Sequence, residues 1–189
     1  MKVYLAGPDV FLPDADRIGR LKRDICKRHG LEGLFPLDSN PPDDGAPLSQ
    51  RIFRANTALM DKADAIIANL TPFRGASADV GTVYELGYML GKGDKCCLGY
   101  SNIARSYLEK VRDQMEIHAD GAGELRDPDD LAVENFDLPD NLMIIHGLEL
   151  SGHPLVLPSE PVTDPLHDLS AFEACARIAA RHKERSGAR

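Results

Sequence analysis

Short apolar runs alternate with helically spaced apolar residues along the first hundred positions. The runs at residues 3–6, 34–37, 65–69 and 95–100 are rich in apolar side chains, which predicts four β-strands. The run at 65–69 shows no alternation with polar residues, as is typical of a strand whose sheet is covered by helices on both faces. The runs therefore predict the strands of a buried sheet.

Helical spacing separates these runs. Ile18, Leu21 and Ile25 recur at helical spacing, with Asp14 as the expected N-cap and Gly30 as the expected stop. Further helices are predicted at 47–62, between the loop at 70–78 and Gly91, at 107–115 and near 168–184. Strands separated by helices need right-handed crossovers. The pattern therefore predicts an α/β fold, a three-layer sandwich with a mostly parallel sheet.

Two later segments lack a clear period. From Asp120 to Asp140 there are eight acidic residues, Arg126 is the only basic one, and glycines and prolines interrupt the pattern. We expect an exposed acidic insertion near 118–140, within a single domain that spans residues 1–189. The apolar run at 142–145 is too short to distinguish strand from helix, and the four prolines of 152–165 predict a loop.

Composition and charge narrow the class of ligand. The chain has 189 residues, of which 43% are hydrophobic, and this suits one compact domain. Its 22 basic and 30 acidic side chains give a net charge of −8, which argues against nucleic acid as a partner. The first apolar run is too short for a signal peptide, and later runs are too short to span a membrane. We expect a cytoplasmic protein that binds a small molecule.

Cysteines and histidines show no close ligand spacing. The four cysteines lack a C-x-x-C pattern, and the adjacent pair Cys96-Cys97 lies in an apolar run, so disulfides are not expected. The six histidines form no H-E-x-x-H or other close pair. We therefore expect neither a dedicated zinc or iron site nor another cofactor.

The candidate chemistry follows the third predicted strand. Ligands of open α/β sheets bind at the carboxyl ends of the strands, and residues 69–88 place Arg74, Asp79, Glu85 and several glycines at one such end. Thr82 and Glu85 have the spacing of a capping box, in which Glu85 would only bond a backbone amide. Alternatively, an ionised Glu85 beside a crevice is a nucleophile. Asp79 is either the N-cap of this helix or a second reactive acid.

No nucleotide-binding fingerprint accompanies these residues. The loop that begins at Gly7 lacks a G-x-G-x-x-G pattern, and the chain lacks a Walker A pattern. A dinucleotide-binding fold of the usual kind is therefore disfavoured.

Three groups of residues together resemble the nucleoside 2-deoxyribosyltransferase family. They are Tyr4-Leu5-Ala6-Gly7-Pro8 with Phe11, the segment 69–91 with Phe73-Arg74-Gly75 and Asp79-Val80-Gly81-Thr82-x-x-Glu85-Leu86-Gly87, and Asn141-Leu142-Met143. They match in order and span most of the first 145 residues. The resemblance implies a flavodoxin-like α/β sandwich and an enzyme that moves 2-deoxyribose between purine and pyrimidine bases, with nucleosides and free bases as its small-molecule partners.

The resemblance also implies a role for each matched residue. Glu85 would be the nucleophile that forms a covalent glycosyl intermediate, Tyr4 would orient it, and Asp79 would act near the sugar and the leaving base. The implied substrate-binding residues are Gly7, Phe11, Asn69, Phe73, Arg74, Gly75, Asn141 and Met143. Some members carry an aspartate where this chain has Asn69. A neighbouring subunit would supply Asn141, so the resemblance implies a homo-oligomer.

Two other functions fit parts of the same pattern. Arg74, Gly75 and Ser77 could bind a phosphate, as expected of a related enzyme that hydrolyses nucleoside 5′-monophosphates at the same bond. A non-catalytic nucleotide-sensing module would use Glu85 only to contact ribose. Catalysis of base exchange distinguishes the transferase from both.

Overall fold

A parallel sheet forms the middle of the molecule. The computed structural model describes residues 1–39 and 41–187, and in them the main sheet has the strand order β2-β1-β3-β4 with every pair parallel. Its strands are β1 (Lys2–Ala6), β2 (Glu32–Leu34), β3 (Ala65–Asn69) and β4 (Cys96–Tyr100). An isolated parallel bridge from Tyr100 to Val156 extends the β4 edge. This is the strand order of flavodoxin-like folds.

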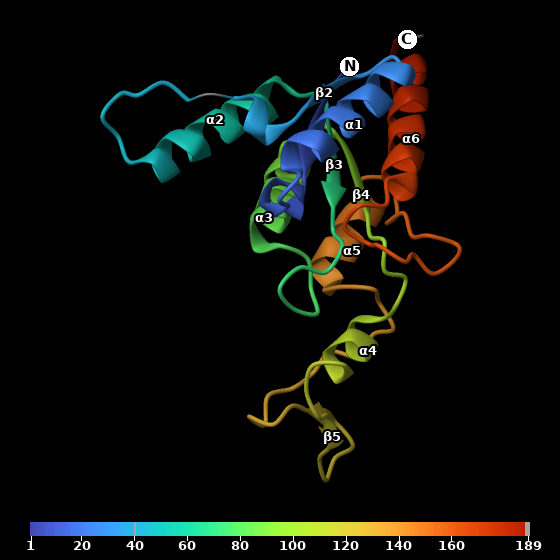
Figure 1. Cartoon of the computed structure of the whole chain (residues 1–189). Coiled ribbons are helices and arrows are strands. Elements are labelled where there is room, and N and C mark those ends of the chain that lie inside the picture. The colour runs from blue at the N-terminus through green and yellow to red at the C-terminus, as the bar shows by residue number, and fades with distance from the viewer. Residues whose placement is uncertain (40, 188–189) are drawn as a thin grey trace.

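Helices cover both faces of this sheet (Figure 1). They are α1 (Ala15–Arg28), α2 (Leu48–Lys62), α3 (Val80–Gly91), α4 (Tyr107–Arg112), α5 (Leu142–Leu150) and α6 (Ser170–Gly187). Alternate strand residues point to opposite faces, so Val3 and Leu5 pack in one core with α1 and α6, while Tyr4 packs in a second core with α2, α3 and α5. The predicted three-layer α/β sandwich is confirmed.

The predicted second strand was displaced along the chain. Residues 32–34 pair with β1, whereas Pro36–Asp38 forms a short 3-10 helix, η2. Pro36 has no N–H for a ladder, and its fixed φ suits the first position of a helical turn. Phe35 lies between the end of β2 and the start of η2, and its buried ring packs against Gly19 of α1. A Cβ on residue 19 would lie only 2.6 Å from this ring, so the contact requires glycine there.

The acidic segment and the ambiguous apolar run adopt different structures. Residues 118–140 include a small antiparallel hairpin of β5 (His118–Ala119) and β6 (Leu125–Arg126), which projects from the sandwich together with α4 (Figure 1). The run at 142–145 belongs to helix α5, where Ile144, Ile145 and Leu148 are buried. Among the described residues, no helix is both long and apolar enough to cross a membrane.

The topology fixes where a ligand can bind. The chain leaves β1 toward β2 on one side, and returns to pair β3 with the other side of β1. Such a reversal of strand order opens a crevice at the carboxyl ends of the strands. The short 3-10 helix η1 (Pro8–Phe11) follows β1 here, and the loop before α3 follows β3.

Candidate active site

A cavity of about 480 Å³ opens at the carboxyl end of β1. Three parts of the chain line it: η1, the region from η2 into α2, and the first turns of α3. The lining residues are Gly7, Val10, Phe11, Pro36, Leu37, Ser39, Pro41, Leu48, Ile52, Asn56, Asp79, Gly81, Thr82 and Glu85. Only two of these described residues are ionisable, Asp79 and Glu85, so a ligand would meet an apolar cleft with two acids on one wall.

Glu85 is held by the central strand. The hydroxyl of Tyr4, which is fully buried in β1, donates a hydrogen bond of 2.6 Å to Glu85 Oε1. Glu85 lies in the second turn of α3, since the helix begins at Val80 with Asp79 as its N-cap. The capping box of Thr82 and Glu85 is therefore wrong: Asp79 binds the Thr82 amide, and the Glu85 carboxylate points to Tyr4 instead.

Burial governs the charge of this pair. Desolvation raises the pKa of Glu85 to about 7, the Tyr4 hydrogen bond opposes that rise, and the negative charge of Asp79 adds to it. Burial, followed by the charge of Glu85, raises the pKa of Tyr4 well above its ordinary value. Tyr4 therefore stays a hydrogen-bond donor, and Glu85 is poised to change protonation near neutral pH.

Asp79 is fixed at the start of the same helix. Its Oδ2 accepts hydrogen bonds of 2.9 Å from both the backbone N–H and the hydroxyl of Thr82. Both bonds go to one oxygen. Asp79 is thus the helix N-cap that the sequence allowed, and it also lines the cavity beside Glu85.

Phe11 of the cavity lining belongs to an aromatic stack. The rings of Phe11 and Phe73 stack with centroids 5.3 Å apart and an angle of 11° between their planes. The Arg74 guanidinium lies 4.6 Å from the Phe73 centroid and 5.1 Å from that of Phe11. Phe11 is still 53% exposed and lines the cavity. Phe73, Arg74 and the neighbouring Gly75 lie behind Phe11, outside the lining itself.

Gly7 lines the cavity above a buried polar cluster. A Cβ on Gly7 would lie 2.2 Å from Asp9 Oδ2, so only glycine fits here. Asp9 accepts a 2.6 Å bond from Lys22 and 3.3 Å bonds from the Asn69 amide. Asn69 Oδ1 accepts from the Thr71 N–H, and the residue is 1% exposed. Asn69 therefore supports the two loops from behind and does not line the cavity.

Asp9 and Lys22 form a buried ion pair that no sequence motif predicted. They are 13 positions apart on η1 and α1, and both side chains are 1% exposed. The Lys22 ammonium also lies 5.1 Å from the centroid of the Phe172 ring in α6. A lysine within the apolar stripe of the predicted helix was the available signal, because a buried charge requires a partner.

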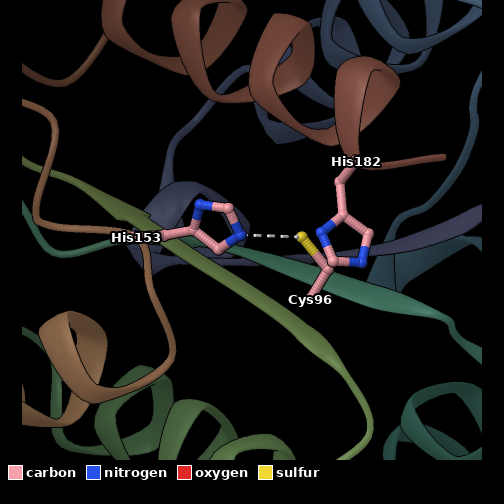
Figure 2. A group of neighbouring side chains, drawn as sticks. All are labelled: Cys96, His153 and His182. Carbon is pink, nitrogen blue, oxygen red and sulfur yellow. Dashed lines mark hydrogen bonds between the residues drawn. The ribbon is translucent and has the colours of Figure 1, made fainter. Parts of the chain in front are cut away.

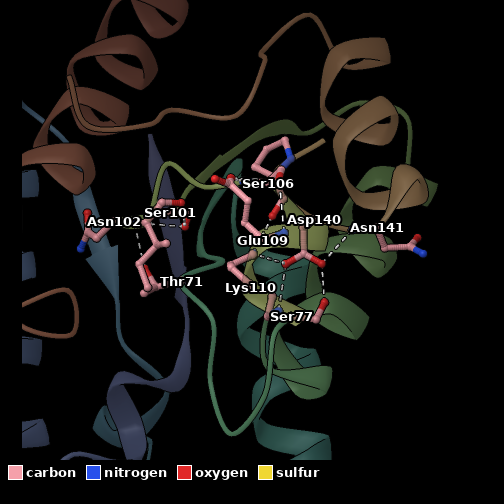
Figure 3. Close-up of polar contacts among 12 residues, drawn as sticks. Thr71, Ser77, Ser101, Asn102, Ser106, Glu109, Lys110, Asp140 and Asn141 are labelled. Atoms are coloured by element: carbon pink, nitrogen blue, oxygen red, sulfur yellow. Dashed lines mark hydrogen bonds and ion pairs between the residues drawn. The ribbon is translucent and has the colours of Figure 1, made fainter. Parts of the chain in front are cut away.

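Asp140 joins the loop before Asp79 to the start of α5 (Figure 3). Its carboxylate accepts hydrogen bonds from the Ser77 hydroxyl, the Ala78 N–H at 3.0 Å and the Asn141 N–H at 2.8 Å. Lys110 lies 4.0 Å away. In the sequence Asp140 was only one of the acidic residues of the predicted insertion. Its 3% exposure shows that it is a structural anchor.

Asn141 and Met143 lie apart from the cavity of their own chain. Asn141 is the N-cap of α5, where its Oδ1 accepts from the Met143 N–H at 3.0 Å. Its amide nitrogen contacts Glu134 at 3.3 Å. Met143 is 75% exposed. Neither residue belongs to the described lining of the cavity, so within one chain the structure does not bring them to Glu85.

Comparisons with known proteins find similar sequences and a similar fold. A family model described as nucleoside 2-deoxyribosyltransferase matches residues 3–143. An uncharacterized protein of Schizosaccharomyces pombe is 34% identical, with 79% of this chain and 78% of that protein covered. The structure is similar to that of a 2-desoxiribosyltransferase from Leishmania mexicana, with a TM-score of 0.65 and 31% identity over 96% of this chain and 97% of that one.

A more distant structure shares the fold alone. A conserved protein from Enterococcus faecalis V583 has a TM-score of 0.56 and 17% identity, with 97% of this chain and 98% of that one covered.

Proposed function

Because the chain belongs to the nucleoside 2-deoxyribosyltransferase family, we propose that it transfers 2-deoxyribose between purine and pyrimidine bases through a covalent intermediate on Glu85. The observation that carries this proposal is the 2.6 Å hydrogen bond from Tyr4 to Glu85, in a cavity that also holds Asp79. An acid that is positioned, partly buried and open to a ligand is equipped to be a nucleophile.

The first half of the reaction breaks the glycosidic bond. A Glu85 oxygen attacks the anomeric carbon, the bond from that carbon to the base nitrogen breaks, and the base leaves with the bonding electrons and takes up a proton. Tyr4 holds the carboxylate through Oε1, which leaves Oε2 to form the ester. The product of this half is a deoxyribosyl ester of Glu85 and a free base.

The second half repeats the displacement with a different base. A nitrogen of the incoming base attacks the anomeric carbon, Glu85 leaves as a carboxylate, and the incoming base loses a proton. Two displacements at one carbon restore its configuration, as in retaining glycosidases. Water in place of the second base would give free deoxyribose, so exclusion of water from the cavity favours transfer.

Asp79 serves the sugar and the departing base in this scheme. One of its oxygens is bonded to Thr82 at the helix N-terminus, which leaves the other for a sugar hydroxyl or for proton exchange with the base. Its position before Val80 keeps it on the wall of the cavity that bears Glu85. A carboxylate so close to Glu85 also favours the oxocarbenium character of the sugar in the transition state.

The aromatic end of the cavity suits the base. The exposed face of Phe11 offers a stacking surface, and Phe73 and Arg74 support that ring from behind. Gly75 leaves this loop free of side-chain bulk, and Gly7 allows the sugar to approach the backbone at the end of β1. Stacking without many directional hydrogen bonds is consistent with exchange among different bases.

We further propose that Asn141 completes the site of a second copy of the chain. Asn141 and the exposed Met143 lie outside the described lining of the cavity of their own chain. Helices α2 and α3 expose further apolar side chains that a second copy would cover, namely Leu48, Ile52, Phe53, Val80 and Tyr84, and of these Leu48 and Ile52 also line the cavity. Figure 1 shows α2 and its preceding loop extending from the sandwich, as expected of a segment that packs on a partner.

The monophosphate hydrolase is supported less well. Of the three residues that would bind a phosphate, Ser77 donates its hydroxyl to Asp140, and a carboxylate next to a phosphate is repulsive. Arg74 is stacked on two rings. A sensing module would use Glu85 only to contact ribose, and that contact does not require a carboxylate held by a buried Tyr4 hydroxyl beside a second acid.

One assay tests the proposal against both alternatives. The protein is incubated with a deoxynucleoside, with and without a second free base, and the products are separated by chromatography. A new deoxynucleoside that forms only with the second base supports the transferase. If the protein releases base only from nucleoside 5′-monophosphates, it is the hydrolase and not the transferase. If it turns over none of these substrates, the sensing module is the function that remains.

A further inference from the structure

Cys96, His153 and His182 converge at the edge of the sheet opposite to the cavity (Figure 2). Cys96 is the first residue of β4, His153 follows α5, and His182 lies in the last turns of α6. The Cys96 sulfur is 3.7 Å from His153 Nε2, and one ligand atom from each residue lies within 4.8 Å of the other two. The sequence spacing concealed this group, because 57 positions separate Cys96 from His153.

The separation of the Cys96 sulfur from the His153 nitrogen is close to that of two ligands on a tetrahedral ion, and the His182 nitrogen lies within 4.8 Å of both. Zinc binds sulfur at about 2.3 Å and imidazole nitrogen at about 2.0–2.1 Å, and tetrahedral angles then separate sulfur from nitrogen by about 3.6 Å. The Cys96 to His153 distance already has this value. The two imidazole rings meet edge to face, with an angle of 66° and centroids 5.8 Å apart, so their nitrogens approach the sulfur from different directions.

The donor set selects a class of metal. One thiolate and two imidazoles suit Zn²⁺, whereas Mg²⁺ and Ca²⁺ require oxygen ligands. The group is partly enclosed: Cys96 is buried and both histidines are half-buried.

We propose that Cys96, His153 and His182 bind one Zn²⁺ ion per chain, with water in the fourth position. As the bond from sulfur to zinc forms, the Cys96 thiol loses its proton to solvent, and the two neutral imidazoles bind through nitrogen lone pairs. The ion would join α6 and the segment after α5 to the start of β4. Cys96 lies within the family match at residues 3–143, whereas both histidines lie beyond it, so the C-terminal part of this chain supplies two of the three ligands.

The position of the group indicates a structural role. In a parallel sheet the amino end of β4 lies at the edge opposite to the carboxyl ends, where Glu85 and the cavity are found. Helix α6 covers one face of the sheet through Phe172, Cys175, Ala176 and Ala179. Zinc would hold this helix in place and raise the stability of the fold, because an ion that binds only the folded state stabilises it by mass action.

The test uses the tag-free full chain, prepared without metal and titrated with Co²⁺ and with Zn²⁺. We expect one ion per chain, a charge-transfer band from sulfur to Co²⁺ in the near ultraviolet, and release of about one proton per ion. Saturating Zn²⁺ should raise Tm by roughly 5 °C. His182→Ala, at a half-buried helix position that tolerates alanine, should weaken binding on the order of 100-fold, and Cys96→Ser should abolish the band.

Matched controls separate this site from others. Cys97→Ser alters the neighbouring thiol, which packs in the other core, and His146→Ala alters an exposed histidine of α5. Both should bind Co²⁺ as the unaltered chain does. A chain that gives no charge-transfer band and no rise in Tm would overturn the proposal, as would an unchanged band in both Cys96→Ser and His182→Ala.

Discussion

The Tyr4 hydroxyl donates a 2.6 Å hydrogen bond to Glu85 Oε1 across 81 positions of the sequence. Tyr4 belongs to the buried strand β1, and Glu85 to the second turn of α3. The contact therefore fixes the carboxylate relative to a central strand of the sheet, which pairs with β2 on one side and β3 on the other. It also sets the balance between burial, which favours the protonated acid, and the hydrogen bond, which favours the anion.

Loss of the Glu85 carboxylate should abolish exchange and preserve the fold. Glu85→Ala removes the nucleophile of the proposed covalent step, so we expect the rate of base exchange to fall by about 10⁴-fold or more. Circular dichroism should remain that of the unaltered chain. Mass spectrometry of the unaltered protein with a slow-opening 2-fluoro-substituted deoxynucleoside should detect a pentose on Glu85, and an adduct on another residue would contradict the assignment.

The rate should depend on pH through the ionisation of Glu85. Only the anion attacks, and the pKa of Glu85 is raised to about 7, so kcat/KM should rise with pH and level off above that value. Tyr4→Phe removes a hydrogen bond that lowers this pKa, and the rising limb should therefore move to higher pH. A limb that stays in place in Tyr4→Phe would show that another group controls it.

The raised pKa of Glu85 should also make the free energy of unfolding depend on pH: the ionised form that the reaction needs at high pH is the form that destabilises the fold. Because the folded pKa of about 7 exceeds the ordinary value of 4.5, the folded state holds its proton more tightly, and this contribution is lost as pH rises through about 7. Glu85→Gln keeps the shape and an acceptor for Tyr4 without the charge. Denaturant unfolding should show this variant more stable than the unaltered chain by about 2 kcal/mol near pH 8.

The control is the same denaturant unfolding experiment carried out at a lower pH. Near pH 4 the unaltered Glu85 is mostly protonated in both states, so the two chains should unfold at similar denaturant concentrations. If the Gln variant were equally stabilised at both values of pH, packing and not charge would be the cause.

The apolar runs of the sequence predicted the positions of β1, β3 and β4, but they misplaced β2. The runs that became β3 and β4 are apolar except for Asn69 at the end of one and Lys95 at the start of the other, and the residues of both strands are buried, so burial and propensity agree. The second strand was misplaced because Leu34 and Leu37 look alike in a pattern, whereas Pro36 between them cannot pair. Strand edges are poorly marked when the flanking residues are also apolar.

In the site, too, residues close in sequence were predicted together, whereas contacts between distant residues were not. Asp79 and Glu85 are near in sequence, so their shared location follows from one strand-to-helix junction. The capping box failed because the sequence offers two N-caps three residues apart, Asp79 and Thr82, and only the packing of α3 on β1 brings Glu85 to Tyr4. Asp140 could not be predicted from the sequence, since its partners lie 62 and 63 positions away.

Asp140 should prove essential for both stability and turnover. Asp140→Ala leaves the N–H groups of Ala78 and Asn141 without an acceptor and Lys110 without its counter-charge, so we expect a loss of about 3 kcal/mol in the free energy of unfolding. The loop that carries Asp79 should loosen, and kcat should fall more than substrate affinity. Asp129→Ala, an exposed acid of the same insertion, is the matched control, and an equal effect of both variants would refute the anchoring role.

Asn141 offers a test of assembly, because one chain does not bring it to its own cavity. Under the proposal that it acts in the site of a second copy, Glu85→Ala and Asn141→Ala should each be poorly active alone. In a mixed two-fold pair, one site combines an intact Glu85 from one chain with an intact Asn141 from the other, and the second site loses both. The two variants should therefore restore activity when they are mixed.

The expected recovery has a definite size. Equal mixing makes about half of the pairs mixed, and half of the sites in those pairs are intact, so activity should return to about a quarter of the value for the unaltered protein. Subunit exchange is verified by mass spectrometry of chains that carry different isotopes, and each variant must give the circular dichroism of the unaltered chain. If exchange is complete and no activity returns, Asn141 does not act in a partner's site. Its hydrogen bonds to Met143 and Glu134 would then be its whole role, as the cap that joins α5 to the acidic insertion.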